Sequence, residues 1–153
     1  MSALREIDLQ GILTESDPRL RLVSEPITDW SVVPALAEKL IRTMVRANGI
    51  GIAAIQIGVP LRMIVVTIDD DPAVMINPRL VRSLRREAVE LEGCLSIPRG
   101  RWQRIARPAK CDVEWQDLAG ASQTATLSKI EARCVMHEIE HLDGLLLTDR
   151  AAA

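Results

Sequence analysis

Two histidines near the C-terminal end of the chain have a spacing suited to metal binding. His137 and His141 are the only histidines among the 153 residues. Residues four apart on an α-helix share one face, so both imidazoles can bind a single ion. Glu138 follows the first histidine, where its carboxylate points away from the pair yet can reach a water held by the ion. This His-Glu-x-x-His order predicts metal-dependent hydrolysis; the alternative is a chance arrangement on a charged helix.

A catalytic centre of this kind needs a third protein ligand. Zincin proteases place this ligand downstream, as a glutamate well beyond the motif or as a histidine. Only 12 residues follow His141 and none is a histidine, so the third ligand must lie upstream. Cys134 precedes His141 by roughly 10 Å along a helix axis, which is too far for a shared ion and favours a place in the core. Cys111 alternates with apolar neighbours and is also expected to pack. Cys94, which follows Gly93 in a bend, is the remaining candidate; its alternative is a small buried side chain at a strand end.

Length and composition place the chain among single-domain soluble proteins. With 153 residues, of which 48% are hydrophobic and 26% charged, it is expected to form one domain over 1–153. No apolar run approaches the roughly 20 residues of a membrane span, and the first ten residues carry charges in place of a signal-peptide core. Three cysteines are too few for a disulfide framework. These features predict a cytoplasmic protein with no membrane partner.

The charge distribution argues against a nucleic-acid partner. The net charge is -2, and Phe and Tyr are absent, so the chain has neither a general attraction to phosphate nor the usual base-stacking platforms. Four arginines cluster in one segment: Arg79, Arg82, Arg85 and Arg86. Arginines around a strand are usually its solvated face. We therefore expect no specific nucleic acid.

Hydrophobic periodicity predicts an α+β fold. Apolar residues recur at helical spacing from about 32 to 47, with Ser31 placed as the cap. Ser128 and Glu131 form a capping box that opens a second helix, which runs to about Leu142 and carries the histidine motif. Residues 1–28 are expected to form an irregular arm that wraps the core. Strand signals separated by tight turns predict antiparallel sheet at 63–68, 73–77, 79–84, 88–91, 110–115 and 124–127.

The glycine-rich segment 49–58 fails the test for a nucleotide-binding loop. It has no third glycine at the required spacing and no Lys-Ser/Thr pair. Glycines at 49, 51 and 58 instead allow close approach of another backbone, for instance an extended substrate that pairs with this edge. Gln56 is the only polar side chain of the segment.

Three ordered motifs resemble those of peptide deformylases, the metal enzymes that remove formate from N-formylmethionine on new bacterial polypeptides. The motifs are GIGIAAIQ at 49–56, EGCLS at 92–96 and HEIEHLDG at 137–144, and the resemblance extends over nearly the whole chain. It implies an α+β fold in which antiparallel β-sheets pack around a central C-terminal metal-binding helix, with an N-terminal helix. That fold agrees with the periodicity of the sequence.

The resemblance implies a role for each motif residue. One divalent metal ion, Fe²⁺ natively with Zn²⁺, Ni²⁺ or Co²⁺ as substitutes, would be bound by Cys94, His137 and His141. Glu138 would act as the general base and later protonate the leaving amine. Gln56 and the backbone N–H of Leu95 would face the oxyanion of the tetrahedral intermediate.

The resemblance also implies a formyl-methionyl peptide as the partner. The peptide would run antiparallel to the edge at Gly51 and alongside the segment after Cys94. Its methionine side chain would enter a pocket formed by Ile50, Ile130, Cys134 and His137. Glu92 and Arg101 match supporting positions, as ions that fix the Cys94 loop.

The chain departs from the family pattern at three motif positions. Ile52, Met136 and Glu140 stand where Leu, Gln and Asp are usual, and none of them is a ligand, the base or an oxyanion donor. Glu140 is one methylene longer than Asp, which would change any contact that its carboxylate makes behind the metal ligands. Many bacterial members carry a further C-terminal helix used at the ribosome, whereas this sequence ends at Ala153. A ribosome contact is therefore allowed by the resemblance but not favoured.

Two other functions stay open at this point. One is a metal-dependent amide hydrolase of the same fold that acts on another formylated or acylated small molecule, which relative rates on formyl-Met and other formyl compounds would distinguish. The other is a catalytically weak deformylase-like protein, or a non-enzymatic module that keeps the metal for stability. The presence of Glu138 and Gln56 argues against the latter, because a structural site has no use for either. A Cys-His-His set suits iron, zinc, nickel and cobalt alike.

Overall fold

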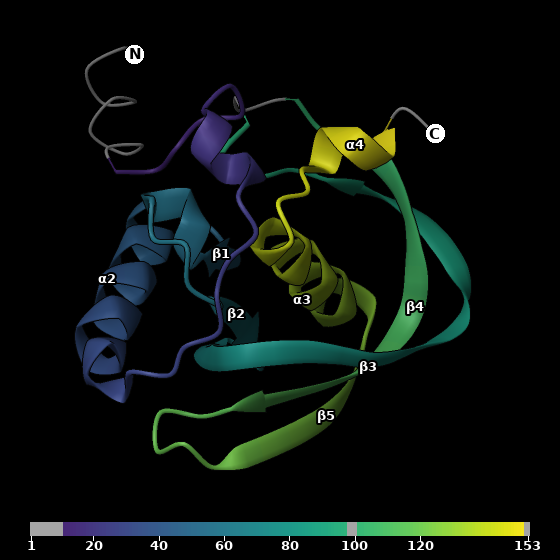
Figure 1. Cartoon of the computed structure of the whole chain (residues 1–153). Helices are drawn as coiled ribbons and strands as arrows, with labels where there is room; N and C mark the ends of the chain where they lie inside the picture. Colours follow the sequence, from purple (N-terminus) through teal and green to yellow (C-terminus); the bar gives the residue numbers. More distant parts are fainter. Residues whose placement is uncertain (1–10, 98–100, 152–153) are drawn as a thin grey trace.

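The computed structural model describes residues 11–97 and 101–151, and these have the expected α+β architecture (Figure 1). The described strands form one antiparallel sheet in the order β1-β2-β3-β4-β5. Their bounds are β1 (Gly51–Ala53), β2 (Met63–Ile68), β3 (Asp71–Glu92), β4 (Gln103–Gln116) and β5 (Ser122–Ser128). The helices in these ranges are α2 (Val33–Arg46), α3 (Lys129–Leu142) and α4 (Leu147–Ala151). The first two confirm the predicted helices, and α4 was not predicted.

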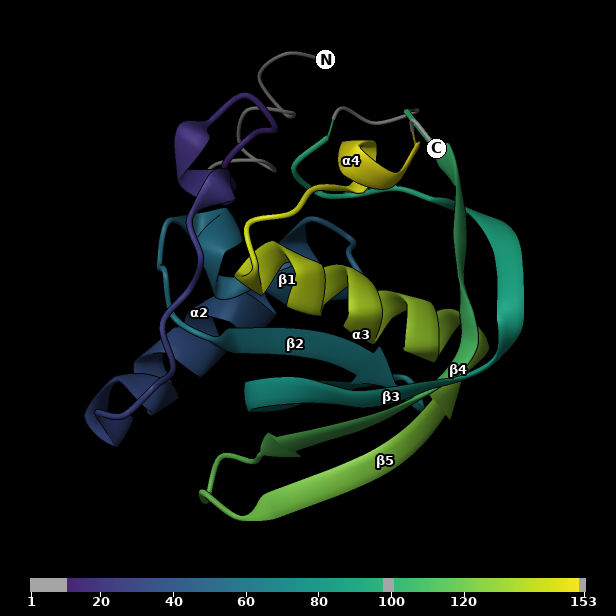
Figure 2. The same ribbon diagram turned by 45° about the vertical axis from the view of Figure 1, so that its right-hand side comes forward.

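The sheet bends around α3, and α2 covers the other face of its first strands. Figures 1 and 2 both show α3 in the curve made by β2, β3 and β4. Side chains alternate along β2: Ile64 and Val66 belong to the core that includes α3, whereas Met63 and Val65 pack with α2. Because both faces of β2 are covered, the strand begins with four apolar residues in succession, 63–66. The helix that carries the histidine motif is therefore central to the molecule.

The long strand β3 is continuous where the sequence patterns suggest interruptions. The patterns predict separate strands at 73–77, 79–84 and 88–91. Pro78 lies at a register shift between β3 and β4, where a residue without an N–H does not break the ladder. Asn77 has φ 51° there, and its side chain accepts a hydrogen bond from the N–H of Ile27 (2.8 Å). β4 also begins earlier than predicted, at Gln103.

Both predicted helix caps are wrong, because neighbouring groups satisfy the helix ends differently. The side chain of Ser128 makes no capping hydrogen bond. Glu131 instead accepts a hydrogen bond from the backbone N–H of Asp69 (2.9 Å) in the β2–β3 turn, so its carboxylate ties the start of α3 to the sheet. Ser31 does not cap α2 either. Its N–H donates to Asp29 (3.0 Å), which caps a short 3₁₀ turn that runs into the helix.

The N-terminal arm is irregular and lies against the core, as expected, over its described part. It donates backbone hydrogen bonds to two carbonyls of the site motifs, from Leu13 to Gln56 (2.7 Å) and from Glu15 to Ser96 (2.8 Å). Residues 1–10 lie outside the described residues. The arm thus braces the two loops that flank the histidine helix.

The outer face of the sheet carries paired charges. Arg79 pairs with Glu114 and Arg82 with Asp112, and both arginine side chains are largely exposed. For these two arginines the solvated-face prediction is confirmed.

None of the helices in the described ranges is both long enough and apolar enough to cross a membrane.

Candidate metal centre

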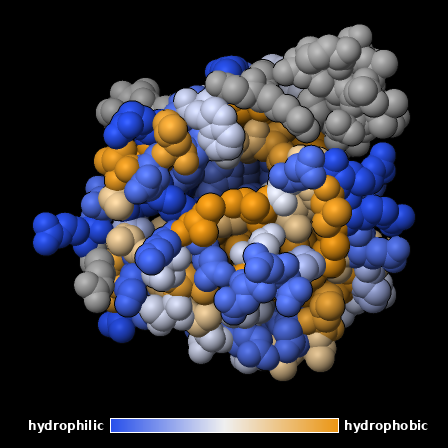
Figure 3. All heavy atoms as spheres, turned by 180° about the vertical axis from the view of Figure 1, so that it is seen from behind, coloured by the Kyte–Doolittle hydropathy of each residue, from blue (hydrophilic) through white to orange (hydrophobic). Residues whose placement is uncertain are grey.

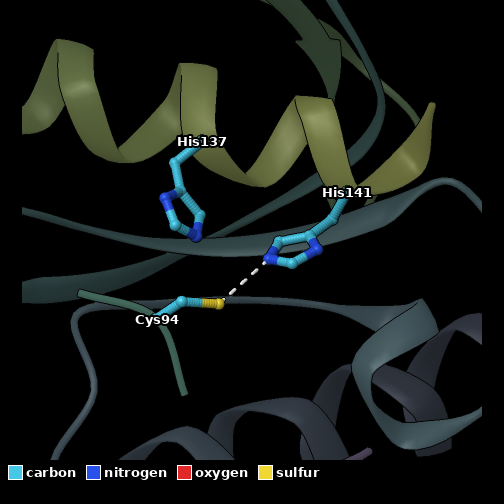
Figure 4. Close-up of side chains that lie close together, drawn as sticks. All are labelled: Cys94, His137 and His141. Carbon is cyan, nitrogen blue, oxygen red and sulfur yellow. Dashed lines mark hydrogen bonds between the residues drawn. The ribbon is translucent and has the colours of Figure 1, made fainter. Parts of the chain in front are cut away.

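Side chains from two distant segments meet at one point. Figure 4 shows Cys94, from the loop after β3, facing His137 and His141 on α3. The ligand atoms of the three residues lie within 4.8 Å of one another. Cys94 Sγ is 3.3 Å from His141 Nε2, and the ring centroids of the two histidines are 5.0 Å apart. The structure therefore brings together the set that the sequence predicts, while Cys111 and Cys134 lie in the core.

Close packing holds the loop that carries Cys94. Gly93 lies against Trp102, whose ring would be 2.8 Å from a Cβ at the glycine position. The N–H of Ile97 donates to the carbonyl of Cys94 (3.0 Å) and closes a tight turn. Cys94 also packs on a small apolar cluster made of Ile97, Ile105 and Leu147. The thiol is thus presented by a supported turn, and α4 supplies part of the support.

A buried carboxylate orients His137. Its Nδ1 lies 3.2 Å from Glu92 Oε1, so Nε2 is the nitrogen left to face Cys94 and His141. Glu92 also accepts two hydrogen bonds from Arg107, from Nε at 2.6 Å and Nη2 at 3.0 Å. Burial raises the pKa of Glu92, but the bonds from His137 and Arg107 outweigh burial and lower the pKa to about 2. Glu92 is therefore ionised and can hold a proton on Nδ1.

Glu138 is buried next to the cluster with one oxygen unpaired. Among the described residues, its Oε1 has no hydrogen-bond partner. Gly51 makes room for the carboxylate: a Cβ at this glycine would lie 2.7 Å from Glu138 Oε2 and 2.5 Å from Cys134 Sγ. Burial raises the pKa of Glu138 to about 7. A carboxylate in this state can both accept and release a proton near neutral pH.

The two expected oxyanion donors lie beside Cys94. Gln56 accepts a hydrogen bond from the N–H of Ala53 (2.9 Å) and donates Nε2 to Ser96 Oγ (3.0 Å). These bonds hold Nε2 at 3.8 Å from Cys94 Sγ. The backbone N–H of Leu95, in the same turn, has no hydrogen-bond partner among the described residues. Both donors are therefore positioned near the thiol.

The residues expected to bind substrate lie on two elements that flank the centre. Ile50 precedes the edge strand β1, and Ile130 is in the first turn of α3; both are at least half exposed. Cys134, one turn further along α3, is buried and donates its thiol to the carbonyl of Ile50 (3.4 Å). β1, which is distant in Figure 1, lies toward the face drawn in Figure 3, and that face is hollowed, with apolar side chains on the rim. Gly51 lies on the outer edge of the sheet.

The two histidines lie in different electrostatic surroundings. Burial lowers the pKa of His141. At His137 burial also acts to lower the pKa, but the nearby Glu138 and the hydrogen bonds with Cys94 and Glu92 outweigh burial and raise the pKa. One thiol and two imidazoles, next to an unpaired buried carboxylate oxygen, form the donor set of a divalent transition metal with three protein ligands.

Sequence reasoning missed the arginines behind the ligands. Arg101 pairs with Glu15 of the N-terminal arm, and the backbone N–H of Glu15 donates to the carbonyl of Ser96 in the Cys94 loop. The partners of Glu92 are Arg107 and Arg133, both buried. The sequence offers one signal for Arg133: it lies among the apolar residues of the helix that carries the histidines, where a charged side chain needs a buried partner.

Glu140, the longer carboxylate noted in the sequence, joins this group of charges. Its Oε1 accepts a hydrogen bond from Arg107 Nη1 (2.7 Å), and its Oε2 accepts one from Arg150 Nε (2.5 Å). The carboxylate thus connects α4 to the arginine that binds Glu92. Both oxygens of the Glu140 carboxylate are therefore hydrogen-bonded to arginines.

Comparisons with known proteins agree with this geometry. The family model described as polypeptide deformylase matches residues 9–153. The peptide deformylase of Rhizobium meliloti is 43% identical over 147 residues, which cover 92% of this chain and 84% of the relative. The structure of the Thermotoga maritima peptide deformylase has a TM-score of 0.88 at 32% identity and covers 93% of this chain and 97% of its own. The structure of a Synechococcus elongatus peptide deformylase in complex with actinonin has a TM-score of 0.88 at 33% identity, and the match covers 92% of this chain and 77% of that one.

The fold and the site define a metal-dependent hydrolase. The matches over most of the chain's length show that it belongs to the peptide deformylase family. It is therefore an enzyme that removes the formyl group from nascent peptides.

Proposed function

We propose that Cys94, His137 and His141 bind one divalent metal ion, Fe²⁺ in the cell, and that Glu138 is the catalytic acid and base. The observation that carries the proposal is the convergence of three ligand atoms within 4.8 Å beside the unpaired Oε1 of Glu138. Zn²⁺, Ni²⁺ and Co²⁺ suit the same donor set. Three protein ligands leave the open position that a hydrolytic centre needs.

The residues of the site divide the chemistry of formyl hydrolysis among them. When bound, the ion supplies a Lewis acid that polarises the formyl carbonyl and lowers the pKa of water. Glu138 takes the proton of the attacking water and passes it to the leaving amine nitrogen. A pKa of about 7 suits both steps. Gln56 Nε2 and the N–H of Leu95 donate hydrogen bonds to the developing oxyanion.

The substrate peptide binds along the free edge of β1. Gly51 offers its backbone there, and main-chain pairing with an edge strand gives affinity without reading side chains. The methionine side chain contacts Ile50, Ile130 and Cys134 on either side of the centre. An Acinetobacter baumannii peptide deformylase bound to Met-Ala-Ser has a TM-score of 0.86 at 27% identity, which supports a peptide as the ligand. Within this proposal the chain works as one domain over 1–153 in the cytoplasm, and ribosome contact is not required.

Metal analysis of single variants tests the ligand assignment. Protein purified without oxygen is expected to hold about one metal ion per chain, and Cys94→Ala, His137→Ala and His141→Ala are each expected to lose it. Cys111→Ala is the matched cysteine control, since its thiol is buried in the core, and Glu138→Gln is expected to keep the metal. Full metal content in all three ligand variants would refute the assignment.

A further inference from the structure

Arg133 is a buried arginine to which the proposed chemistry assigns no role. It lies one turn before His137 on α3 and is only 9% exposed. Its Nη1 donates to Glu92 Oε2 (2.7 Å) and to the carbonyl of Ile105 on β4 (3.0 Å). Its Nη2 donates to the carbonyl of Ala88 on β3. One guanidinium therefore joins α3, both long strands and the carboxylate that orients a proposed ligand.

The contacts of Glu92 show what Arg133 adds. Oε1 faces His137 Nδ1 (3.2 Å) and Arg107 Nη2 (3.0 Å), and Oε2 faces Arg107 Nε (2.6 Å) and Arg133 Nη1 (2.7 Å). Arg107 is shared, because its Nη1 is bound to Glu140. Arg133 is the partner that fixes Glu92 to the backbone of the sheet. Without it, the carboxylate is free to turn with Arg107 and Glu140.

We propose that Arg133 is a positioning residue for the metal centre. It locks the Glu92 carboxylate in the orientation that holds the Nδ1 proton of His137, so that Nε2 stays aimed at Cys94 and His141. The inference rests on the metal site proposed above. Partners behind a ligating histidine tune metal affinity by about 10- to 100-fold. The planar fork of arginine matches three acceptors at once, which the single ammonium of lysine does not.

Competition with a chelator for Co²⁺ tests the inference without any substrate. Arg133→Met keeps the length of the side chain and removes its donors; it is expected to weaken Co²⁺ binding by at least about tenfold and to shift the visible d–d bands of the bound ion. Arg133→Lys is expected to recover part of the affinity. Arg82→Met, which removes an exposed arginine paired with Asp112, is the matched control and is expected to bind Co²⁺ as the wild type does.

A double variant separates positioning from general support. If Arg133 acts through Glu92, then Arg133→Met adds less than about a twofold effect on Co²⁺ affinity in a Glu92→Gln background. An equal effect in both backgrounds overturns the inference. The inference is also overturned if Arg133→Met binds Co²⁺ with the affinity and the spectrum of the wild type. A lower urea midpoint of the variant does not change that conclusion.

The remaining outcomes are also decisive. If Arg133→Met does not fold, Arg133→Lys decides: weaker Co²⁺ binding with shifted bands supports the inference, and wild-type binding overturns it. Failure of the wild type to bind Co²⁺ refutes the proposed metal site itself, and the inference with it. Co²⁺ binding by the wild type together with unaltered binding in both Arg133 variants refutes the inference alone.

Discussion

Gly51 is glycine because two groups of the site already occupy the space that a side chain would need. A Cβ there would lie 2.5 Å from Cys134 Sγ and 2.7 Å from Glu138 Oε2. We predict that Gly51→Ala displaces the Glu138 carboxylate and lowers kcat/KM for a formyl peptide by about 100-fold, the cost of a shift near 1 Å in a catalytic group. Metal content should be unchanged, because the three ligands lie elsewhere. Steady-state kinetics at matched metal content provide the measurement, and near-normal kcat/KM would show that Glu138 does not depend on this space.

The roles of some site residues could be predicted from the sequence, and the roles of others could not. Cys94, His137 and His141 could be brought together because each lies in a short motif whose chemistry allows few alternatives. Arg133 could not be assigned, because its contact with Glu92 depends on how α3 meets β3 and β4. The family resemblance suggests that Arg101 supports the Cys94 loop, but it does not reveal the partner, Glu15, whose backbone N–H donates to Ser96 in that loop. Long-range ion pairs leave no local pattern from which they can be predicted.

The short helix α4 stabilises the Cys94 loop through one buried side chain. Leu147 is 2% exposed and packs with Ile97 and Ile105, next to Cys94. We predict that Leu147→Ala lowers the free energy of unfolding by about 2–5 kcal/mol and weakens metal binding, because the loop loses its packing partner. Leu145→Ala is the matched control, since Leu145 is 44% exposed. Urea unfolding and metal titration of both variants make the comparison, and equal effects would contradict a specific role for Leu147.

The strand β4 contains a thiol that should make the fold sensitive to alkali. Burial raises the pKa of Cys111 from 9.0 to about 11. The unfolded chain therefore loses this proton at a lower pH than the folded chain, and stability falls as pH rises from 9 to 11, by about 1.4 kcal/mol per pH unit. Cys111→Val lacks this loss, whereas Cys134 contributes equally to both proteins. Urea unfolding at pH 7 and pH 10 measures the free energy of unfolding of both proteins. The variant should become more stable relative to the wild type at pH 10, whereas the same difference between the two proteins at both pH values would rule out Cys111 as the cause.

Element boundaries were predictable where the burial of a whole face decides them, and not where a local signal competes with a tertiary contact. The apolar spacing of α2 and the continuous apolar run of β2 depend on burial of whole faces, so the sequence pattern and the structure agree. Pro78 reads as a break, but a register shift in β3 accommodates it. The capping box of α3 fails because Glu131 bonds to the β2–β3 turn, and Lys129 takes φ 55°. A tertiary contact outweighed the local preference.

The whole molecule should be more stable with metal than without it. Ligands from the loop after β3 and from α3 converge only in the folded chain, so a metal ion that binds this state shifts the unfolding equilibrium. At a free metal concentration 100 times the Kd, the gain is about 2.7 kcal/mol. Urea unfolding with Co²⁺ and with a chelator should show this difference for the wild type and none for His141→Ala. The same shift in His141→Ala would mean that the metal stabilises the fold from another site.

At the scale of the fold, the class and the central place of the metal helix could be predicted, whereas the curvature of the sheet could not. Periodicity distinguishes helices from strands, and short turns imply antiparallel pairing. The bend that wraps β3 and β4 around α3 (Figure 2) arises from register shifts in the β3–β4 pair, which depend on both strands at once. That bend places Glu92, Arg107 and the Cys94 loop behind and beside the histidines.

Formate release is the most direct test of the central claim, that Glu138 works beside a metal held by Cys94, His137 and His141. The assay uses formyl-Met-Ala and Fe²⁺-loaded protein without oxygen, and compares the wild type with Glu138→Gln at equal metal content. We predict formate release by the wild type and a rate lower by about 10²- to 10⁴-fold in the variant, as expected for loss of a general base. Equal rates for the two proteins, or no formate from the wild type with either iron or nickel, would contradict the account.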